Sequence, residues 1–459
     1  MNEISRLGGA LGTLAVILAL TSACSGEKTS VILISVDSLR YDQIGRVVDG
    51  VPVAPFMTRL ADESLVYERA ISPAPWTTPS MASILTGLPP QAHRVNEHDR
   101  ALSSEVTTLA ELFDDAGYRT AAFVPAITLR ESYGMDQGFE IYDFEGFGHN
   151  RISSPALIGK VMQRLEEWKD EPYFLWVHLW DPHYNYLPPT GFRYRLSGGT
   201  EPESEDVQKL KWEHRPVSED GAEFLKRRFQ EEIIYTDEHV AELFEFLDGA
   251  GLSERTVVAL VADHGEAFLE HGWLGHTNRL DDELVHVPLM LWGPGRVAPG
   301  RVEDTVSTSQ LGRTLASLAG LDGNGFGRYS PLPGSAGTTA GDGGVPVLSE
   351  TVRRGCWHSV ASATHRYVLD ARTCEEDLFA FDKSDTSSAA LEEHRDLMRR
   401  ALSEIEEWDV PVAETAEREF ASARKKLGGL GYVDTFGDRE DFENCDESPP
   451  MACLDRLER

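Results

Sequence analysis

The chain has 459 residues, which is ample for a large hydrophobic core and for more than one domain. Its 76 acidic residues outnumber its 43 lysines and arginines, so the formal net charge is −33. This charge disfavours nucleic acid and anionic membrane surfaces as partners, and by default it indicates a well-solvated surface.

The N-terminus has the pattern of a targeting segment. Arg6 precedes an apolar stretch at residues 7–20, and a short run of small residues leads to Cys24. The stretch is short for a membrane-spanning helix. It resembles a bacterial lipoprotein signal, in which residues 1–23 are removed and lipid is attached to Cys24. We therefore expect an exported protein, anchored by lipid to a bacterial membrane at its periplasmic face or at the cell surface. The alternatives are a cleaved signal without lipid and an uncleaved anchor.

Two apolar runs predict buried parallel strands that end on aspartates. Residues 30–36 and 256–262 are rich in β-branched side chains, and Asp37 and Asp263 follow them directly. Because ligand-binding groups cluster beyond the carboxyl ends of such strands, we expect both carboxylates at one edge of the sheet. His264 is adjacent to Asp263, so that both could reach one divalent cation. Taken alone, each aspartate has a plainer interpretation, as a helix cap or part of a polar turn.

A helix is predicted between these two strands. Thr78 and Pro79 are typical of an N-cap and a first helical residue, and Gly87 is typical of a helix end. The hydroxyl of Thr77 would then lie near the N–H groups at the start of the helix, where negative charge is stabilised. The alternative is that Thr77 or Thr78 only caps the helix.

Three histidines are candidates for contacts with a substrate. His183 lies in an aromatic-rich loop, His276 lies in a polar loop, and His178 follows a predicted strand at residues 174–177. Any of them could donate a proton to a leaving group. The plainer alternatives are a loop histidine for His183, a surface histidine for His276 and a satisfied core histidine for His178, which is the weakest of the three candidates.

The order of these motifs resembles the sulfatase-like branch of the alkaline phosphatase superfamily over roughly residues 29–321. The segments that carry the resemblance are the strand ending at Asp37, Thr77 to Gly87, Asp181-Pro182-His183, Asp263-His264-Gly265-Glu266 and Val287-Pro288-Leu289. The resemblance implies an α/β fold with a mostly parallel central sheet, helices on both faces, and hydrolysis or transfer of small-molecule, lipid or glycan esters. It also implies one divalent metal ion, with Ca, Mn, Zn and Mg all open. The ligands implied for it are Asp37, Thr77, Asp263 and His264.

Departures from the family pattern indicate a threonine nucleophile. Thr77 occupies the position of the Cys or Ser that sulfatases oxidise to formylglycine, and Met81 occupies that of an arginine. Because threonine carries a methyl group on Cβ, the same oxidation could not yield an aldehyde. The pattern that remains resembles the threonine-nucleophile enzymes of the superfamily, which implies cleavage of phosphate mono- or diesters through a covalent Thr77 intermediate. The alternatives are a sulfuric ester hydrolase and an inactive binding protein that keeps the fold.

Composition divides the chain further. We expect a catalytic domain at residues 24–321, a flexible link rich in Gly, Ser, Thr and Pro at 322–344, and a small β-rich subdomain with an acidic tail at 345–459. Amphipathic helices are predicted at 229–247 and 391–408. In an oxidising compartment we expect the pairs that are near in sequence, Cys356–Cys374 and Cys445–Cys453, with free thiols as the alternative. The sequence does not indicate the oligomeric state.

Overall fold

The computed structural model describes residues 28–97, 100–144, 153–202, 216–323, 325–335, 337–338, 346–352, 355–381, 386–411, 413 and 450–457. The predicted signal segment with Cys24, and also Cys445, lie outside the described residues. Within the described ranges no helix has both the length and the apolar composition needed to cross a membrane.

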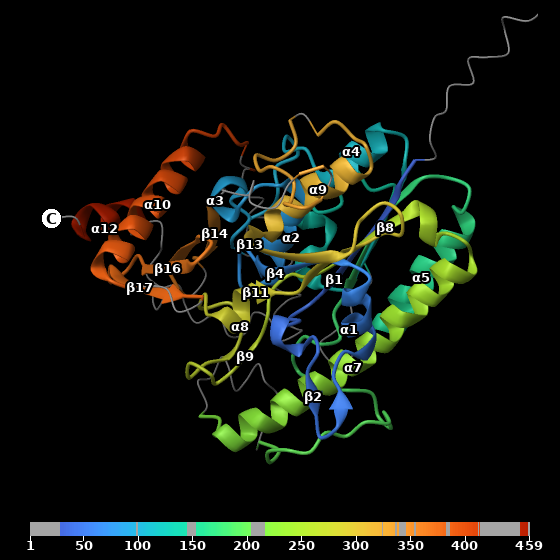
Figure 1. Cartoon of the computed structure of the whole chain (residues 1–459), viewed down its shortest axis with the longest axis horizontal. Helices are drawn as coiled ribbons and strands as arrows, with labels where there is room; N and C mark the ends of the chain where they lie inside the picture. Colours follow the sequence, from blue (N-terminus) through green and yellow to red (C-terminus); the bar gives the residue numbers. More distant parts are fainter. Residues whose placement is uncertain are drawn as a thin grey trace, which may run out of the picture.

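A nine-stranded sheet forms the centre of the molecule (Figure 1). Neighbouring strands run parallel in the order β8, β1, β7, β5, β6. These strands are Thr256–Ala262 (β8), Ser30–Val36 (β1), Tyr173–Leu179 (β7), Arg119–Val124 (β5) and Ile141–Phe144 (β6). Every residue of β1, β7 and β8 is buried, as their nearly continuous apolar runs require.

The rest of the sheet continues beyond β8. β12 (Leu289–Trp292) is antiparallel to both β8 and β4 (Leu65–Ile71), and β4 also pairs with β11 (His286–Val287) and β13 (Gly300–Ser307). The short hairpins are β2 (Val47–Val48) with β3 (Val51–Pro52), and β9 (Ala267–Phe268) with β10 (Leu274–Gly275). This topology confirms the predicted α/β fold with a mostly parallel central sheet.

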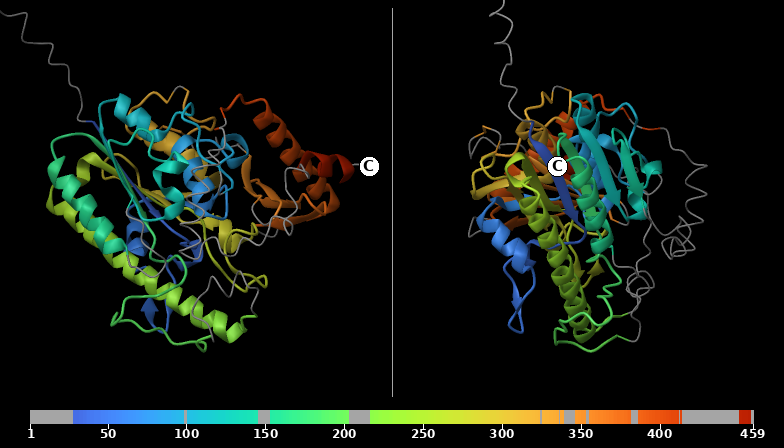
Figure 2. Two further views of the ribbon diagram at one scale, coloured as in Figure 1. Left: turned by 180° about the vertical axis from the view of Figure 1, so that it is seen from behind. Right: turned by 90° about the vertical axis from the view of Figure 1, so that its right-hand side faces the viewer.

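Helices cover both faces of the sheet (Figure 1 and Figure 2). One face carries α1 (Pro55–Asp62), α5 (Ser154–Glu167) and α7 (Glu219–Gly249), and the other carries α2 (Thr77–Thr86), α4 (Leu109–Asp115) and α9 (Leu311–Leu318). Two short helices, α3 (Pro90–His93) and α8 (Asp282–Val285), lie in connecting segments. The predicted helix at residues 229–247 is therefore only the C-terminal part of α7, which begins after Ser218 because the Ser218 hydroxyl accepts a hydrogen bond from Gly221 N.

Asp237 on α7 caps the start of α1. Its two carboxylate oxygens accept hydrogen bonds from the backbone N–H groups of Phe56 and Met57, each at 2.8 Å. Burial raises the pKa of Asp237 to about 6, although the two N–H donors oppose this. The contact fixes α1 against α7.

The β9–β10 hairpin is tied to the body of the molecule by Glu270. Its Oε1 lies 2.6 Å from Arg40 Nη1 and 2.8 Å from Lys226 Nζ. Arg40 Nη1 also donates to the carbonyl oxygen of Glu266 at 2.9 Å. The segment after β8 is therefore held both to the loop after β1 and to α7.

A second, antiparallel sheet of four strands forms a C-terminal subdomain, which confirms the predicted β-rich unit. Its strands, in order, are β14 (Val347–Thr351), β15 (Trp357–Ala361), β16 (His365–Asp370) and β17 (Glu375–Ala380). α10 (Ser388–Glu406) packs on it, close to the predicted bounds, and α12 (Pro450–Leu457) packs against α10. β14 lies along the segment that leads to α2, since Ser349 Oγ donates to Ser72 O and Glu350 N donates to Pro73 O.

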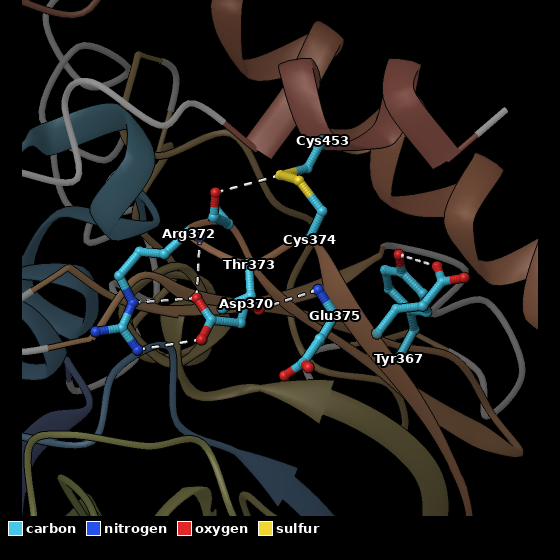
Figure 3. The surroundings of a disulfide bond; sticks show 9 residues. Tyr367, Asp370, Arg372, Thr373, Cys374, Glu375 and Cys453 are labelled. Atoms are coloured by element: carbon cyan, nitrogen blue, oxygen red, sulfur yellow. Dashed lines mark hydrogen bonds and ion pairs between the residues drawn. A yellow bond between two sulfur atoms is a disulfide. The ribbon is translucent and has the colours of Figure 1, made fainter. Parts of the chain in front are cut away.

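A disulfide joins Cys374 to Cys453 across a sequence separation of 79 (Figure 3). The predicted pairs Cys356–Cys374 and Cys445–Cys453 are therefore wrong. α12 returns to the turn between β16 and β17, where Cys374 lies, so that a cysteine distant in sequence is the spatial neighbour. The turn is also held by Arg372, whose guanidinium binds both oxygens of Asp370 at 3.1–3.2 Å.

Part of the segment predicted as a flexible link packs on the core. Phe326 and Leu332 are buried. A Cβ atom on Gly87 would lie 2.9 Å from Gly327 Cα, and Gly87 itself has a φ of +66° at the end of α2. Glycine is required there both for the left-handed backbone and for this close approach.

Candidate active site

Asp37 and Asp263 lie side by side at the carboxyl edge of the sheet. Val36 of β1 is paired with Ala262 of β8, so the next residue of each strand leaves the sheet at the same place. Both aspartates are completely buried. The register of β1 against β8 therefore brings the two carboxylates to one edge of the sheet, as the sequence predicts.

The Asp37 carboxylate is surrounded by polar groups. Oδ1 accepts a hydrogen bond from Ser38 Oγ at 2.7 Å, while Oδ2 lies 3.2 Å from His178 Nε2 and 3.3 Å from Thr77 Oγ1. Burial alone would raise the pKa of Asp37, but the imidazoles of His183, His178 and His264 hold it well below its usual range. Asp37 is therefore a carboxylate at neutral pH.

One oxygen of Asp263 accepts no hydrogen bond from the residues that the structure describes. Oδ1 accepts hydrogen bonds from Ser38 N at 3.2 Å and from His264 N at 2.9 Å. Oδ2 is buried and has no hydrogen-bond partner within the part of the chain that the structure describes. Burial and the neighbouring Asp37 raise the pKa of Asp263 to about 6. A buried carboxylate oxygen without a donor needs a positive partner.

Thr77 stands at the start of α2 with its hydroxyl directed at this pair. Its Oγ1 lies 3.3 Å from Asp37 Oδ2 and 3.4 Å from His264 Nε2. The helix begins at Thr77, two residues earlier than predicted, and Thr78 donates to Thr128 O at 3.1 Å and does not cap the helix. Ser80 Oγ donates to Asp263 O at 2.7 Å, which fixes the first turn of α2 to the end of β8.

His264 presents its Nε2 to the same point. Its Nδ1 donates to Gly265 O at 2.8 Å, and its Nε2 lies 3.4 Å from Asp263 Oδ2 and 3.8 Å from Asp37 Oδ1. Burial would lower the pKa of His264, but the Asp263 and Asp37 carboxylates raise it above its ordinary value. The four ligands predicted from the resemblance thus converge on one place.

A divalent cation fits these residues. Two buried carboxylates, a hydroxyl and an imidazole supply the donor atoms. Oδ2 of Asp263, which accepts no hydrogen bond from the described residues, is the oxygen most in need of a cation. Asp37, His178 and Asp263 also bring ligand atoms within 4.8 Å of one another, so that His178 is a second candidate for the imidazole ligand. This donor set suits Ca, Mn, Zn and Mg.

His276 and His183 flank the same point. His276 Nδ1 lies 3.0 and 3.2 Å from the two carboxylate oxygens of Glu266, and its ring is 4.3 Å from that of His264. His183 Nδ1 donates to Tyr184 O at 2.8 Å, and its ring lies 5.2 Å from His276. The structure therefore brings both predicted substrate-contacting histidines to the site.

Sequence reasoning assigned no role to Glu266 or Tyr184. Glu266 is completely buried and follows His264 by two residues. Its position at the end of the Asp-His-Gly-Glu motif is the sequence signal that points to a role in the site. Tyr184 stacks on His276 with ring centroids 5.2 Å apart, and no sequence pattern predicts this contact.

His93 and His271, the other histidines near the motifs, do not join this group. Burial lowers the pKa of His93 to about 3, and its Nδ1 accepts from Val95 N while its Nε2 lies 3.0 Å from Ser83 Oγ. His271 is exposed and lies 3.5 Å from Glu283.

Comparisons with known proteins agree with this geometry. Residues 29–321 match the family model described as Sulfatase. Iduronate 2-sulfatase of Mus musculus is 28% identical over 398 residues, which cover 66% of this chain and 72% of that protein. Choline-sulfatase of Rhizobium meliloti (strain 1021) is 25% identical over 487 residues, covering 88% of this chain and 93% of that protein. The phosphonate monoester hydrolase of Agrobacterium radiobacter shares the fold, with a TM-score of 0.66 and 17% identity over 82% of this chain and 96% of the other.

The family match spans more than half of the chain and includes Asp37, Thr77, His178, His183 and the Asp263–His276 segment. The chain therefore belongs to the Sulfatase family, within the alkaline phosphatase-like superfamily, and is an ester hydrolase of that family.

Proposed function

We propose that this enzyme cleaves phosphate mono- or diesters with Thr77 as the nucleophile. One observation carries the proposal: Thr77 Oγ1 lies 3.3 Å from Asp37 Oδ2 and 3.4 Å from His264 Nε2, at the start of α2. Thr77 occupies the position at which a sulfatase carries formylglycine, and threonine cannot be oxidised to that aldehyde. Its hydroxyl is thus the nucleophile that this position offers.

A bound divalent ion, held by Asp37, Thr77, Asp263 and His264, would lower the pKa of the Thr77 hydroxyl and polarise a non-bridging oxygen of the ester. Thr77 attacks phosphorus as the alkoxide after its proton has passed to solvent. The Oγ1–P bond forms as the bond from phosphorus to the leaving oxygen breaks. Water then attacks the phosphothreonine, breaks the Oγ1–P bond and releases the product.

The leaving oxygen needs a proton, and His276 is our first candidate to supply it. Glu266 fixes the orientation of the His276 ring through Nδ1, as a group that positions a proton donor does. His183 is the second candidate, and its ring is held through Nδ1 by Tyr184 O. The His276 ring lies beside that of His264, whose Nε2 contacts the Thr77 hydroxyl, and the His183 ring lies beside that of His276.

Sulfuric ester hydrolysis is the second candidate function, because relatives at 28% and 25% identity are named as sulfatases. The deciding experiment compares p-nitrophenyl sulfate, p-nitrophenyl phosphate and bis-p-nitrophenyl phosphate with several divalent metals. Thr77→Val and Thr78→Val form a matched pair, since both remove a buried hydroxyl from the first turn of α2. We expect metal-dependent turnover of a phosphate ester that Thr77→Val abolishes and Thr78→Val retains. Turnover of the sulfate alone would refute the phosphoester assignment.

We also propose export and lipid attachment at Cys24. The lipoprotein pattern of residues 20–24 supports this, as does the Cys374–Cys453 disulfide, because structural disulfides persist in oxidising compartments. Cys24→Ser should move the protein from the membrane fraction to the soluble fraction of cells. Retention of the variant in the membrane fraction would contradict lipid anchoring.

A further inference from the structure

Two buried histidines, His178 and His264, both direct Nε2 at the carboxylate pair, and their hydrogen bonds differ in kind. We propose that His178 is a positioning residue, which donates its Nε2–H to Asp37 and does not bind the metal, so that His264 remains the imidazole ligand. The assignment of the ligand rests on the metal site of the proposed function. The hydrogen-bond assignment to each ring nitrogen does not depend on it.

The tautomer of His264 follows from its partner at Nδ1. That partner is the carbonyl oxygen of Gly265 at 2.8 Å, which can only accept a hydrogen bond. The hydrogen of the neutral ring is therefore on Nδ1, and Nε2 carries a lone pair. Nε2 lies at similar distances from three oxygens, 3.4 Å from Thr77 Oγ1, 3.4 Å from Asp263 Oδ2 and 3.8 Å from Asp37 Oδ1. We expect this position for an imidazole nitrogen that binds the same metal ion as the three oxygens.

His178 has the opposite arrangement, because its Nδ1 faces a hydroxyl. Ser35 Oγ lies 2.8 Å from His178 Nδ1 and accepts the indole N–H of Trp176 at 2.9 Å. An indole N–H is a donor only, so the hydrogen of Ser35 must go elsewhere. Its two possible acceptors are His178 Nδ1 at 2.8 Å and Val177 O at 3.4 Å, and the distance to Val177 O is beyond the range of about 2.5–3.0 Å that is typical of an O–H···O hydrogen bond. Ser35 therefore donates to Nδ1, and the ring hydrogen is on Nε2.

Asp37 is the end of this chain of hydrogen bonds. His178 Nε2 lies 3.2 Å from Asp37 Oδ2, and the hydrogen that Nε2 carries is directed at this carboxylate oxygen. The hydrogen bonds run in one direction from Trp176 through Ser35 and His178 to Asp37. All four residues are completely buried, and Ser35 is paired with His178 in the register of β1 and β7. The chain fixes the plane of the carboxylate that also contacts Thr77.

The proposed role of His178 predicts how the affinity for metal should differ among variants of the protein. His178→Leu removes the donor, and we expect Cd²⁺ to bind about 10- to 100-fold more weakly, as is typical for loss of a group that orients a ligand. His178→Gln restores an N–H donor near the position of Nε2, and we expect it to recover most of the affinity. His264→Gln removes the ligand itself and should be the weakest binder. His93→Gln, which alters a buried histidine outside the site, is the control and should bind like the unaltered protein.

The decisive measurement is nuclear magnetic resonance of the protein labelled with ¹⁵N-histidine at pH 8. Without metal, we expect His178 to carry its hydrogen on Nε2 and His264 to carry it on Nδ1, with signals assigned from the two Gln variants. After addition of ¹¹³Cd²⁺, coupling between cadmium and nitrogen should appear at His264 only. A hydrogen on Nδ1 of His178, or cadmium coupling at His178, would overturn the proposal. Absence of cadmium binding would instead refute the metal site of the proposed function, and the metal-free spectrum would still decide the role of His178.

Discussion

Replacement of Asp263 by asparagine should change stability in opposite directions with and without metal. The amide side chain would keep an oxygen for the two backbone donors that now bind Oδ1. Its nitrogen would take the place of Oδ2, which is buried without a hydrogen-bond partner among the described residues and lies 3.4 Å from His264 Nε2. In the metal-free protein the substitution therefore removes a buried charge beside Asp37 and adds a donor.

The magnitude follows from the pKa of Asp263, which burial and Asp37 raise from 3.8 to about 6. This rise in the pKa means that the folded protein is destabilised by about 3 kcal/mol when Asp263 is ionised. Because the folded-state pKa is the higher one, the penalty is absent below about pH 4, develops as the pH rises from about 4 to about 6, and is complete above about pH 7. Asp263→Asn should therefore raise the melting temperature of the metal-free protein at pH 8 by about 3–6 °C and have little effect at pH 4.

Metal should reverse the order. A cation bound by the unaltered protein at 1,000 times its Kd adds about 4.1 kcal/mol to the free energy of unfolding, which exceeds the gain of about 3 kcal/mol from the substitution, whereas the variant has lost a charged ligand and should gain little from the metal. Thermal unfolding of residues 25–459 in chelator and in added metal, at pH 4 and pH 8, measures all four cases. Asp237→Asn is the control: the pKa of Asp237 is also raised to about 6, but both of its oxygens accept backbone hydrogen bonds. The Asp237→Asn control should destabilise the protein with or without metal. The reasoning would be refuted if the metal-free Asp263→Asn variant were less stable than the unaltered protein at pH 8.

Three further substitutions test other parts of the structure. Burial would raise the pKa of Glu270, but its two paired cations lower it to about 2, so Glu270→Gln should reduce the free energy of unfolding at pH 7 by about 2 kcal/mol after allowance for solvent screening. The difference should shrink as the pH falls from 4.5 towards 2, and a difference independent of pH would contradict the assignment. Cys374→Ser should cost about 4 kcal/mol by the loop-entropy estimate for the 79-residue separation from Cys453, measured by urea unfolding, and reductant should then have no further effect at this bond. Glu266→Gln should slow turnover about 10- to 100-fold more for phenyl than for p-nitrophenyl esters if it orients His276 as proton donor, and equal losses would exclude that role.

The sequence predicts the main features of the fold because these depend on local patterns. The apolar runs of β1 and β8 identify buried strands, and the aspartates after them identify the edge at which a site is built. The two carboxylates then meet because Val36 is paired with Ala262. Helix bounds were less accurate where local signals compete. Thr77 and Thr78 are both acceptable at a helix start, and the contact of Thr78 with Thr128 O, distant in sequence, decides between them.

Contacts between distant segments were not predictable in the same way. Cys374 pairs with Cys453 because α12 returns to the β16–β17 turn, and spacing along the chain contains no signal for that return. The hydrogen bond between Ser35 and His178 depends on the register of β1 against β7, so a serine within an apolar strand gave no sign of its role.

The charge of the site explains why a metal and the substrate must act together. The protein carries a formal charge of −33, and Asp37 and Asp263 place two buried carboxylates where an anionic ester would have to bind. Without a cation these carboxylates repel both each other and the ester. A divalent ion cancels that charge at the point where Thr77 Oγ1 lies, so the same residues that repel the substrate in the metal-free protein provide the means of holding it. In the proposed function, metal binding is therefore a condition for substrate binding as well as for activation of Thr77.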